Sequence, residues 1–362
     1  LIAKAQGEGP FPGTKSAVTG EYVPRLAEPG EETGDGALQF TLREGLVFAN
    51  GNPLTSSDVR FTVDRTFNSP TSYVGSLLTL AGINSADQVE IIDDLNFRFV
   101  PANGVTPLLY ELLSELHTVI VDQETVEANA TAEDPWATEW LTSNTAGAGP
   151  YILSRVEPGV EFAYEPNTNF YAAPDVPTNS GVVIKVIPTA ADRVLLLRNG
   201  DVDVLRGVPY TEIDDLMQTD GIRVLTYSSL DGRLIGMNNN IAPFDNIQVR
   251  QAIAYAIPYE EILQSVWAGY ADPLQSIVFA GMPTSDFSFW NYSTDLDRAR
   301  ELLAEAGYPD GFETTLVTRA DNQEDQQVAV LVQDALREIG VTVNIESMLS
   351  GAYAARQFGD RD

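Results

Sequence analysis

Apolar runs that can form buried strands alternate with amphipathic helical segments along this chain, and this alternation constrains the fold more than any other feature. Residues 181–187 (GVVIKVI) are almost continuously apolar, residues 190–199 (AADRVLLLRN) have helical spacing, and Gly200 is placed to end that helix. Residues 203–205 follow as another short strand. This order, with short connections, predicts an α/β protein whose mostly parallel sheet is covered by helices and places ligands at strand ends.

The same pattern returns in the C-terminal third of the chain. Helices are predicted at 248–257, 295–307 and 327–340, and strands at 313–318 and 341–347. A second α/β lobe is therefore predicted there. No evident element closes this lobe after its last strand, and we expect the natural chain to continue beyond this sequence.

Turn and capping signals separate short strands in the first part of the chain. Residues 38–48 (LQFTLREGLVF) alternate apolar and polar side chains, and Asn50 and Gly51 follow as a tight-turn pair. This combination predicts a hairpin. A helix capped by Thr55 or Ser56 is predicted directly after it.

Further elements lead to a second concentration of turn residues. Residues 89–100 predict two short strands, and residues 107–117 predict a helix that opens with proline. Glycine and proline then gather at 146–151 (AGAGPY). We interpret this segment as the crossing between two lobes.

Composition excludes several classes of protein. Cysteine is absent and histidine occurs once, which excludes disulfide frameworks, zinc fingers, iron–sulfur clusters and His-rich metal sites. The 52 acidic and 21 basic residues give a formal net charge of −31, which makes nucleic acid a poor partner. The acidic surface is either solubilising, as in a salt-adapted host, or a field that attracts cationic ligands. No run approaches the ~20 apolar residues of a membrane span.

Motifs that carry a catalytic mechanism are missing. The sequence has no phosphate-binding GxxxxGK[ST] loop, no GxSxG nucleophile elbow, no HExxH zinc motif and no calcium-binding loop. His117 ends an apolar helix without an evident partner for general-base chemistry. Adjacent carboxylates such as Asp93 and Asp94 point in different directions from a helix or strand. We therefore predict binding rather than catalysis, with no catalytic residue, no metal and no cofactor.

Four longer segments carry a recognisable combination of these elements. They are residues 40–65 (FTLREGLVFANGNPLTSSDVRFTVDR), 146–171 (AGAGPYILSRVEPGVEFAYEPNTNFY), 195–205 (LLLRNGDVDVL) and 237–263 (MNNNIAPFDNIQVRQAIAYAIPYEEIL). Together they resemble extracellular solute-binding protein family 5, the oligopeptide, dipeptide and nickel class that serves ABC importers.

The resemblance extends through 299–312 and 337–347, so it covers the chain from about Tyr22 onward. Two positions depart from the family pattern. Ala148 stands where Thr, Ser or Asn is more usual, and Pro258 replaces the common Asp before a helix, which should alter capping rather than function.

The resemblance implies an α/β fold of the periplasmic-binding-protein type II (cluster C) kind, with two lobes, a ligand cleft at the hinge and an accessory subdomain. Residues 1–146 are then mostly the accessory subdomain of lobe 1, residues 147–233 the core of lobe 1, and residues 234–362 lobe 2. The usual beginning and last part of the family's chain are missing. Ligand binding is expected to select a closed conformation without a covalent step.

The resemblance also places seven residues at the ligand, as cleft-lining groups, a strand-end loop and a hinge-side segment. These are Tyr73 and Glu115, then Arg206 and Gly207, then Ser229, Leu230 and Asp231. Asp231 can accept a ligand amine and Arg206 can hold a carboxylate through a bidentate pair. Ordinary packing of Tyr73 and a surface role for either charged group remain equal alternatives.

The implied function is that of the extracytoplasmic substrate-binding component of an ABC importer, which captures an oligopeptide or dipeptide-like ligand and delivers it to the permease. Its expected partners are that ligand and the transmembrane permease subunits. We expect a monomer with its signal peptide removed, periplasmic or extracellular. It would meet the membrane only through the permease or through a lipid anchor on the outer face of the cytoplasmic membrane.

The ligand class stays open at this point. The family also carries nickel chelates, opines and oligosaccharides, and a sugar would favour aromatic platforms among Trp267, Phe289, Trp290 and Tyr292, which ordinary packing also explains. The single histidine disfavours a direct nickel site but leaves a chelated metal open. Two other classes remain, a hydrolase working with two carboxylates and a receptor that signals to a partner protein.

Overall fold

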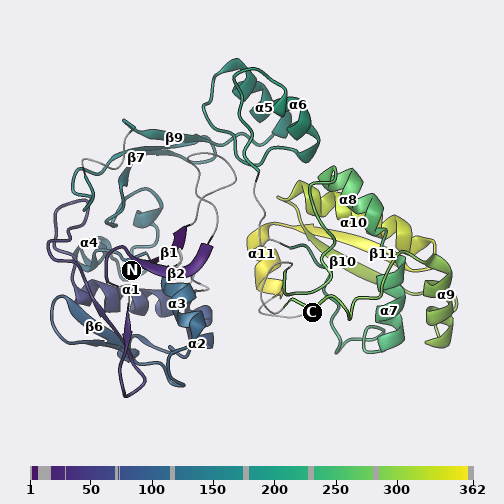
Figure 1. Cartoon of the computed structure of the whole chain (residues 1–362), viewed down its shortest axis with the longest axis horizontal. Helices are drawn as coiled ribbons and strands as arrows, with labels where there is room; N and C mark the ends of the chain where they lie inside the picture. The colour runs from purple at the N-terminus through teal and green to yellow at the C-terminus, as the bar shows by residue number, and fades with distance from the viewer. Residues whose placement is uncertain are drawn as a thin grey trace. The chain divides into compact units, whose positions relative to one another are not determined.

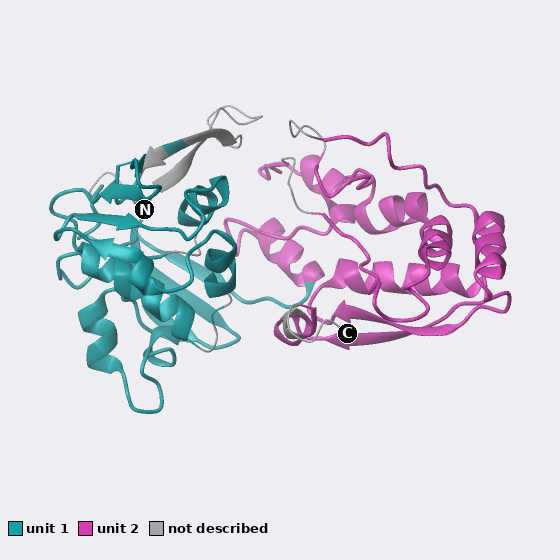
Figure 2. Cartoon of the chain, turned by 90° about the horizontal axis from the view of Figure 1, so that it is seen from below, with its two compact units in different colours: residues 1–189 teal, residues 190–362 magenta. Residues whose placement is uncertain are grey.

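The computed structural model describes residues 2–6, 18–28, 30–69, 72, 74–114, 119–173, 179–226, 232–279 and 285–357. The chain forms two compact units, residues 1–189 and residues 190–362 (Figure 2). Each unit has its own hydrophobic core. The three-part division at residues 146 and 233 stays a prediction.

Unit 1 is organised by an antiparallel sheet with the order β3-β4-β6-β5. Its strands are β3 (Glu31–Glu32), β4 (Leu38–Thr41), β5 (Val89–Ile91) and β6 (Asn96–Phe99). Leu38 lies opposite Phe99 and Phe40 opposite Phe97, and all four side chains are at most 1% exposed. The alternation of side chains along each strand therefore buries one face of the sheet.

The helices of unit 1 are α1 (Ser56–Asn68), α2 (Val74–Leu80), α3 (Pro107–Ser114) and α4 (Gln123–Asn129), with 3₁₀ turns η1 (Ala86–Gln88) and η3 (Trp140–Thr142). Two of these helices, α1 and α4, begin at capping residues, Thr55 and Asp122. Thr55 is the N-cap of α1, and its N–H donates to Asp58 Oδ2 at 2.9 Å. The turn before it places Gly51 at φ +95°, in the left-handed region that glycine tolerates. The predicted turn and capped helix are confirmed.

Two smaller antiparallel sheets complete unit 1. One pairs β1 (Ile2–Gln6) with β2 (Val18–Pro24), and the other has the order β7 (Tyr151–Glu157), β8 (Glu161–Pro166), β9 (Val182–Lys185). The prediction of a buried parallel strand at 181–187 was wrong for β9. This strand runs antiparallel to β8 at the edge of its sheet, and Val183 and Ile184 are about half exposed, at 54% and 51%.

Unit 2 contains most of the helices predicted from sequence periodicity. The predicted helices correspond to α5 (Ala190–Asn199), α7 (Ile247–Ala256), α9 (Leu296–Glu305) and α10 (Gln323–Arg337). The unit also contains α6 (Ile213–Met217), α8 (Tyr259–Trp267), α11 (Ser350–Ala355) and the 3₁₀ turn η4 (Tyr210–Glu212). Its strands are β10 (Glu313–Arg319) and β11 (Thr342–Met348). Residues 203–205 form a bend and irregular backbone rather than the predicted strand, because the loop after α5 pairs with no strand among the described residues.

The core of unit 2 is a parallel pair of strands packed against helices (Figure 1). Buried residues of α7, α9 and α10, among them Ile253, Leu302 and Val332, share this core with Val343 of β11. β10 and β11 are the parallel strands of the described residues, whereas the sheets of unit 1 are antiparallel. The prediction of a mostly parallel sheet therefore holds for this pair of strands and was wrong for unit 1.

Two glycines meet just before the parallel strands begin. A Cβ atom on Gly311 would lie 2.0 Å from the carbonyl oxygen of Gly340, and both residues have positive φ angles, +77° and +85°. The backbones approach so closely that Thr342 N–H donates to Phe312 O at 2.8 Å. Glycine at both positions is therefore required for the strands to start side by side.

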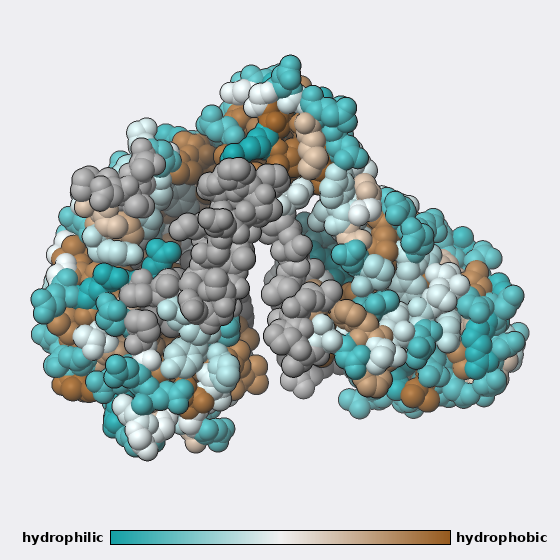
Figure 3. Space-filling view, viewed as in Figure 1, coloured by the Kyte–Doolittle hydropathy of each residue, from teal (hydrophilic) through white to brown (hydrophobic). Residues whose placement is uncertain are grey.

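The surface is largely hydrophilic, in keeping with the acidic composition. Figure 3 shows apolar residues gathered over the part of the chain that carries α5 and α6, where Leu195, Val204 and Met217 are exposed. Within the described residues, every helix is too short or too polar to cross a membrane.

Substitution of Gly340 by alanine tests the close approach of the two backbones. We expect Gly340→Ala to lower the free energy of unfolding by about 1–3 kcal/mol, because it adds a Cβ at positive φ with Asp310 O only 2.9 Å away. Gly351→Ala is the control, since a Cβ there meets nothing within 4 Å. Urea denaturation measures both. Equal stability of the two variants would contradict the proposed constraint.

Candidate functional site

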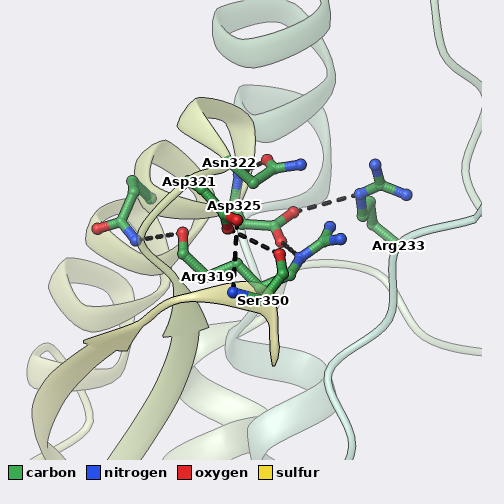
Figure 4. Close-up of polar contacts among 7 residues, drawn as sticks. Arg233, Arg319, Asp321, Asn322, Asp325 and Ser350 are labelled. Carbon is green, nitrogen blue, oxygen red and sulfur yellow. Dashed lines mark hydrogen bonds and ion pairs between the residues drawn. The ribbon is translucent and has the colours of Figure 1, made fainter. Parts of the chain in front are cut away.

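A cluster of polar side chains lies at the carboxyl ends of the two parallel strands in unit 2. The last residue of β10, Arg319, lies opposite Met348, the last residue of β11. Both strands then turn into helices, through Asp321 and Asn322 into α10 and through Leu349 into α11. Figure 4 shows side chains from both connections directed toward one another. The carboxyl edge of parallel strands is where α/β proteins bind ligands.

Short-range hydrogen bonds give the two connections their shape. Asn322 caps α10 by accepting a hydrogen bond from Asp325 N–H at 2.8 Å, and Ala320 N–H donates to Met348 O at 2.8 Å. Ser350 Oγ donates to Asp321 Oδ1 at 2.7 Å. The two strand ends are therefore joined through backbone and side chain alike.

One carboxylate, that of Asp325, contacts two arginines. Its Oδ2 lies 2.6 Å from Arg319 Nε and its Oδ1 lies 3.2 Å from Arg233 Nε. The Asp325 side chain is 18% exposed, whereas those of Arg319 and Arg233 are 30% and 37% exposed. The carboxylate is thus more buried than the two arginine side chains that contact it, and Figure 4 shows it between them.

Contacts within the cluster favour the charged forms of Arg319 and Asp321. The hydrogen bond to Asp325 raises the pKa of the Arg319 guanidinium, although partial burial opposes this shift. The hydroxyl of Ser350 lowers the pKa of Asp321, with a smaller contribution from the positive charge of Arg319. The arginine therefore keeps its positive charge and the aspartate its negative charge.

This arrangement leaves part of Arg319 available for recognition. Among the described residues, the hydrogen bonds of its guanidinium are confined to Nε. The terminal nitrogens Nη1 and Nη2 can therefore donate to an additional acceptor. A guanidinium offers parallel N–H groups that match the two oxygens of a carboxylate or phosphate. The cluster is suited to binding a small anion at a strand end.

The residues predicted from the family resemblance have different outcomes. Five of them, Tyr73, Glu115, Ser229, Leu230 and Asp231, lie outside the described residues, as does His117.

Arg206 and Gly207 are described. They lie exposed between α5 and η4, where Gly207 adopts φ +73° and its carbonyl accepts from Arg193 Nη2 at 3.4 Å. No ion pair of Arg206 is present within the described residues. The roles of all seven residues stay predictions.

Arg319, Asp325 and Arg233 were not singled out from the sequence. Two signals in the sequence could have identified Arg319. It directly follows the predicted strand 313–318, and Asp321 and Asn322 come next as turn and capping residues. The rule that places ligands at strand ends, applied to Arg206, selects Arg319 equally well.

The aromatic residues considered for sugar binding are largely occupied by packing. The Trp290 and Tyr292 rings are 5.2 Å apart, Tyr292 contacts Tyr255, and Trp290 contacts Tyr259. Trp267 packs against the core of unit 2, whereas Phe289 is 81% exposed. Packing therefore accounts for three of these four residues.

Unit 1 contains a shallow hollow of about 710 Å³ beside the hairpin turn. Asp93, Asp94 and Asn96 line it together with apolar residues of the hairpin. Asp93 Oδ1 already accepts hydrogen bonds from the N–H groups of Leu95 and Asn96. The hollow lacks a basic group in its lining, so it is a weaker candidate for an anion than the Arg319 cluster.

Known proteins resemble this chain along most of its length. The family model described as "Bacterial extracellular solute-binding proteins, family 5 Middle" matches residues 21–361. The glutathione-binding protein GsiB of Salmonella paratyphi A is 26% identical over 336 residues, covering 92% of this chain and 62% of that protein. The chain thus spans less than two thirds of the length of the curated relatives it matches.

Two solved structures are also similar. DppA from Helicobacter pylori, in complex with peptide STSA, has a TM-score of 0.80 and 25% identity, covering 98% of this chain and 69% of that chain. AgaA of A. tumefaciens R10, in complex with agropinic acid, has a TM-score of 0.77 and 25% identity, covering 94% of this chain and 67% of that chain.

The contact between Ser350 and Asp321 predicts a change in acid titration. Ser350→Ala should raise the pKa of Asp321 toward its ordinary value of 3.8, because the hydroxyl is the largest cause of the lowered pKa. A folded-state pKa below the unfolded value gives stability that is present above about pH 4 and lost as pH falls through the folded pKa. The stability difference between wild type and variant should shrink on acidification.

NMR titration of the Asp321 carboxyl carbon measures this pKa directly. Ser347→Ala is the matched control, because its hydroxyl donates to Gln326 Oε1 at 3.0 Å instead. An Asp321 pKa that is the same in wild type and Ser350→Ala would show that the hydroxyl does not stabilise the carboxylate.

Proposed function

This chain belongs to the bacterial extracellular solute-binding proteins of family 5, and we propose that it binds a peptide-like solute through the solute's carboxylate for delivery to an ABC permease. The family and the α/β binding-protein fold, both predicted from the sequence, are confirmed by the family match and the similar structures. The family consists of solute-binding proteins rather than enzymes.

The position of Arg319 is the main observation that supports a ligand with a carboxylate. Its guanidinium stands at the carboxyl end of a parallel strand, is held at Nε, and keeps its terminal nitrogens for an acceptor. The related proteins support the same class of ligand, since their names mention glutathione, a peptide and an acid. Each of these molecules carries a carboxyl group, the partner that a guanidinium binds in a bidentate manner.

A peptide is favoured over the alternative solutes. The aromatic residues that would form sugar platforms are mostly packed against one another or against the core of unit 2. Within the described residues, no group of three or more acidic or histidine side chains is arranged to hold a metal ion. A chelate that carries its own carboxylates remains the second candidate, because Arg319 suits its organic part.

The remaining predictions complete the proposal. Asp231 accepts the amine of the ligand, and Tyr73, Glu115, Arg206, Gly207, Ser229 and Leu230 contribute other contacts. The parts 1–146, 147–233 and 234–362 form the accessory subdomain, the core of lobe 1 and lobe 2. The protein is a monomer outside the cytoplasmic membrane, in the periplasm or attached by a lipid anchor, and its partner is the transmembrane permease.

Substitution of Arg319 tests the proposed carboxylate contact. Arg319→Gln should weaken binding of peptides with a free C-terminal carboxylate by at least about tenfold, as expected for loss of a hydrogen bond between charged groups. Peptides with an amidated C-terminus should lose much less. Arg337→Gln is the control, because that arginine is exposed and pairs with Asp334 at the far end of α10. Calorimetric affinities that do not change in Arg319→Gln would exclude Arg319 from the site.

A screen of ligand classes tests the function itself. Di-, tri- and tetrapeptides and glutathione at about 100 times their dissociation constant should each add about 2.7 kcal/mol to the free energy of unfolding. Oligosaccharides and nickel chelates serve as competing classes in the same thermal-shift assay. Stabilisation by those classes alone would replace the proposed ligand, and conversion of any ligand detected by mass spectrometry would restore the hydrolase alternative.

A further inference from the structure

Asp325 joins two segments of unit 2 that are distant in sequence. Arg319 and Asp325 belong to the connection from β10 to α10, whereas Arg233 belongs to the segment that leads toward α7. One carboxylate oxygen lies at each arginine, Oδ2 at Arg319 and Oδ1 at Arg233 (Figure 4). An arginine from a distant segment is therefore part of the strand-end site.

The carboxylate of Asp325 is held in a defined place. It lies in the first turn of α10, where its own N–H donates to Asn322 Oδ1 at 2.8 Å. The same helix buries Ala329, Val332 and Leu336 in the core of unit 2. An anchor fixed in this way restricts a long arginine side chain that would otherwise sample many rotamers.

The contact at Nε also determines which part of Arg319 faces outward. Because Nε binds Asp325, the plane and the direction of the guanidinium are set by the internal carboxylate. A guanidinium binds a planar anion with a fixed geometry, so its orientation decides whether both oxygens of a carboxylate are met at once. Orientation of Arg319 thus controls discrimination between a carboxylate and a neutral group of similar shape.

From these contacts we infer that Asp325 is a positioning residue that holds Arg319 in the orientation that selects carboxylate ligands, and that Arg233 holds Asp325 in turn. This inference rests on the proposed function, since it assigns a role in that same site. It extends the site from one strand end to the segment at 232–238.

The opposite effect is expected if Asp325 acts only through its charge. A negative group beside an anion site repels the anion, so its neutralisation would tighten the binding of a carboxylate ligand. A positioning role predicts that neutralisation weakens this binding, because Arg319 loses its fixed orientation. The direction of the change therefore distinguishes the two roles.

Asp325→Asn is the variant that measures this direction. The probes are one tripeptide with a free C-terminus and the same tripeptide amidated, and the readout is the dissociation constant of the amide divided by that of the free acid. We expect Asp325→Asn to reduce this ratio by about tenfold, mainly by weakening the free acid. Asp325→Glu, which keeps the carboxylate, should recover part of the ratio. Asp334→Asn, on the same helix and paired with Arg337, is the matched control.

Arg233→Gln tests the second contact. If Arg233 acts through Asp325, the Arg233→Gln substitution should reduce the ratio when it is made in wild type. The same substitution should cause little further change in an Asp325→Asn background. Additive effects of the two substitutions would contradict the link between these residues. If either Asp325→Asn or Arg233→Gln folds poorly, the other single variant still measures the ratio.

The outcomes separate the inference from the function on which it rests. A wild-type protein that binds neither tripeptide, or binds both equally, overturns the proposed carboxylate contact and this inference with it. A wild type that discriminates, together with an Asp325→Asn variant whose ratio is unchanged or increased, overturns the positioning role alone. A decreased ratio in Asp325→Asn, with a normal ratio in Asp334→Asn, supports the inference.

Discussion

The parallel pairing of β10 with β11 is the constraint on which the candidate site depends. The pairing is continuous from Glu313 opposite Thr342 to Arg319 opposite Met348. The close backbone approach of Gly311 and Gly340 brings the starts of the strands together, and the hydrogen bond from Ala320 to Met348 joins their ends. A slip of one residue would turn the Arg319 side chain to the opposite face of the sheet. The site is therefore a consequence of strand register.

An anion-binding site in a strongly acidic protein depends on short-range contacts. The chain carries a formal net charge of −31, which does not attract anions over long distances. Salt screens interactions between exposed charges beyond ~8 Å at physiological ionic strength, whereas a bidentate contact acts at hydrogen-bonding distance. Asp325 contributes to this short-range chemistry by holding two guanidinium groups together at one place. Ligand recognition at such a site depends on direct contact rather than on long-range electrostatic attraction.

Local signals in the sequence predicted many elements, and their failures have physical causes. The strands at 313–318 and 341–347 and the helix at 190–199 correspond closely to β10, β11 and α5. The apolar run at 181–187 was wrongly read as buried, since periodicity does not reveal whether a neighbouring element covers a strand. The predicted helix at 327–340 began four residues too late, because the polar first turn of α10 carries no apolar periodicity. Asp325 was thereby left outside the helix.

The sequence by itself determined the family, through the resemblance of four segments, and also the α/β class and the principle that a ligand belongs at a strand end. The α/β class follows from local patterns, namely caps, turns, strand alternation and the spacing of apolar residues. Only the tertiary structure decided which strand end carries the cluster and which arginine joins it from elsewhere. Arg233 meets Asp325 because two segments distant in sequence pack against each other, and no periodicity or motif encodes such a contact.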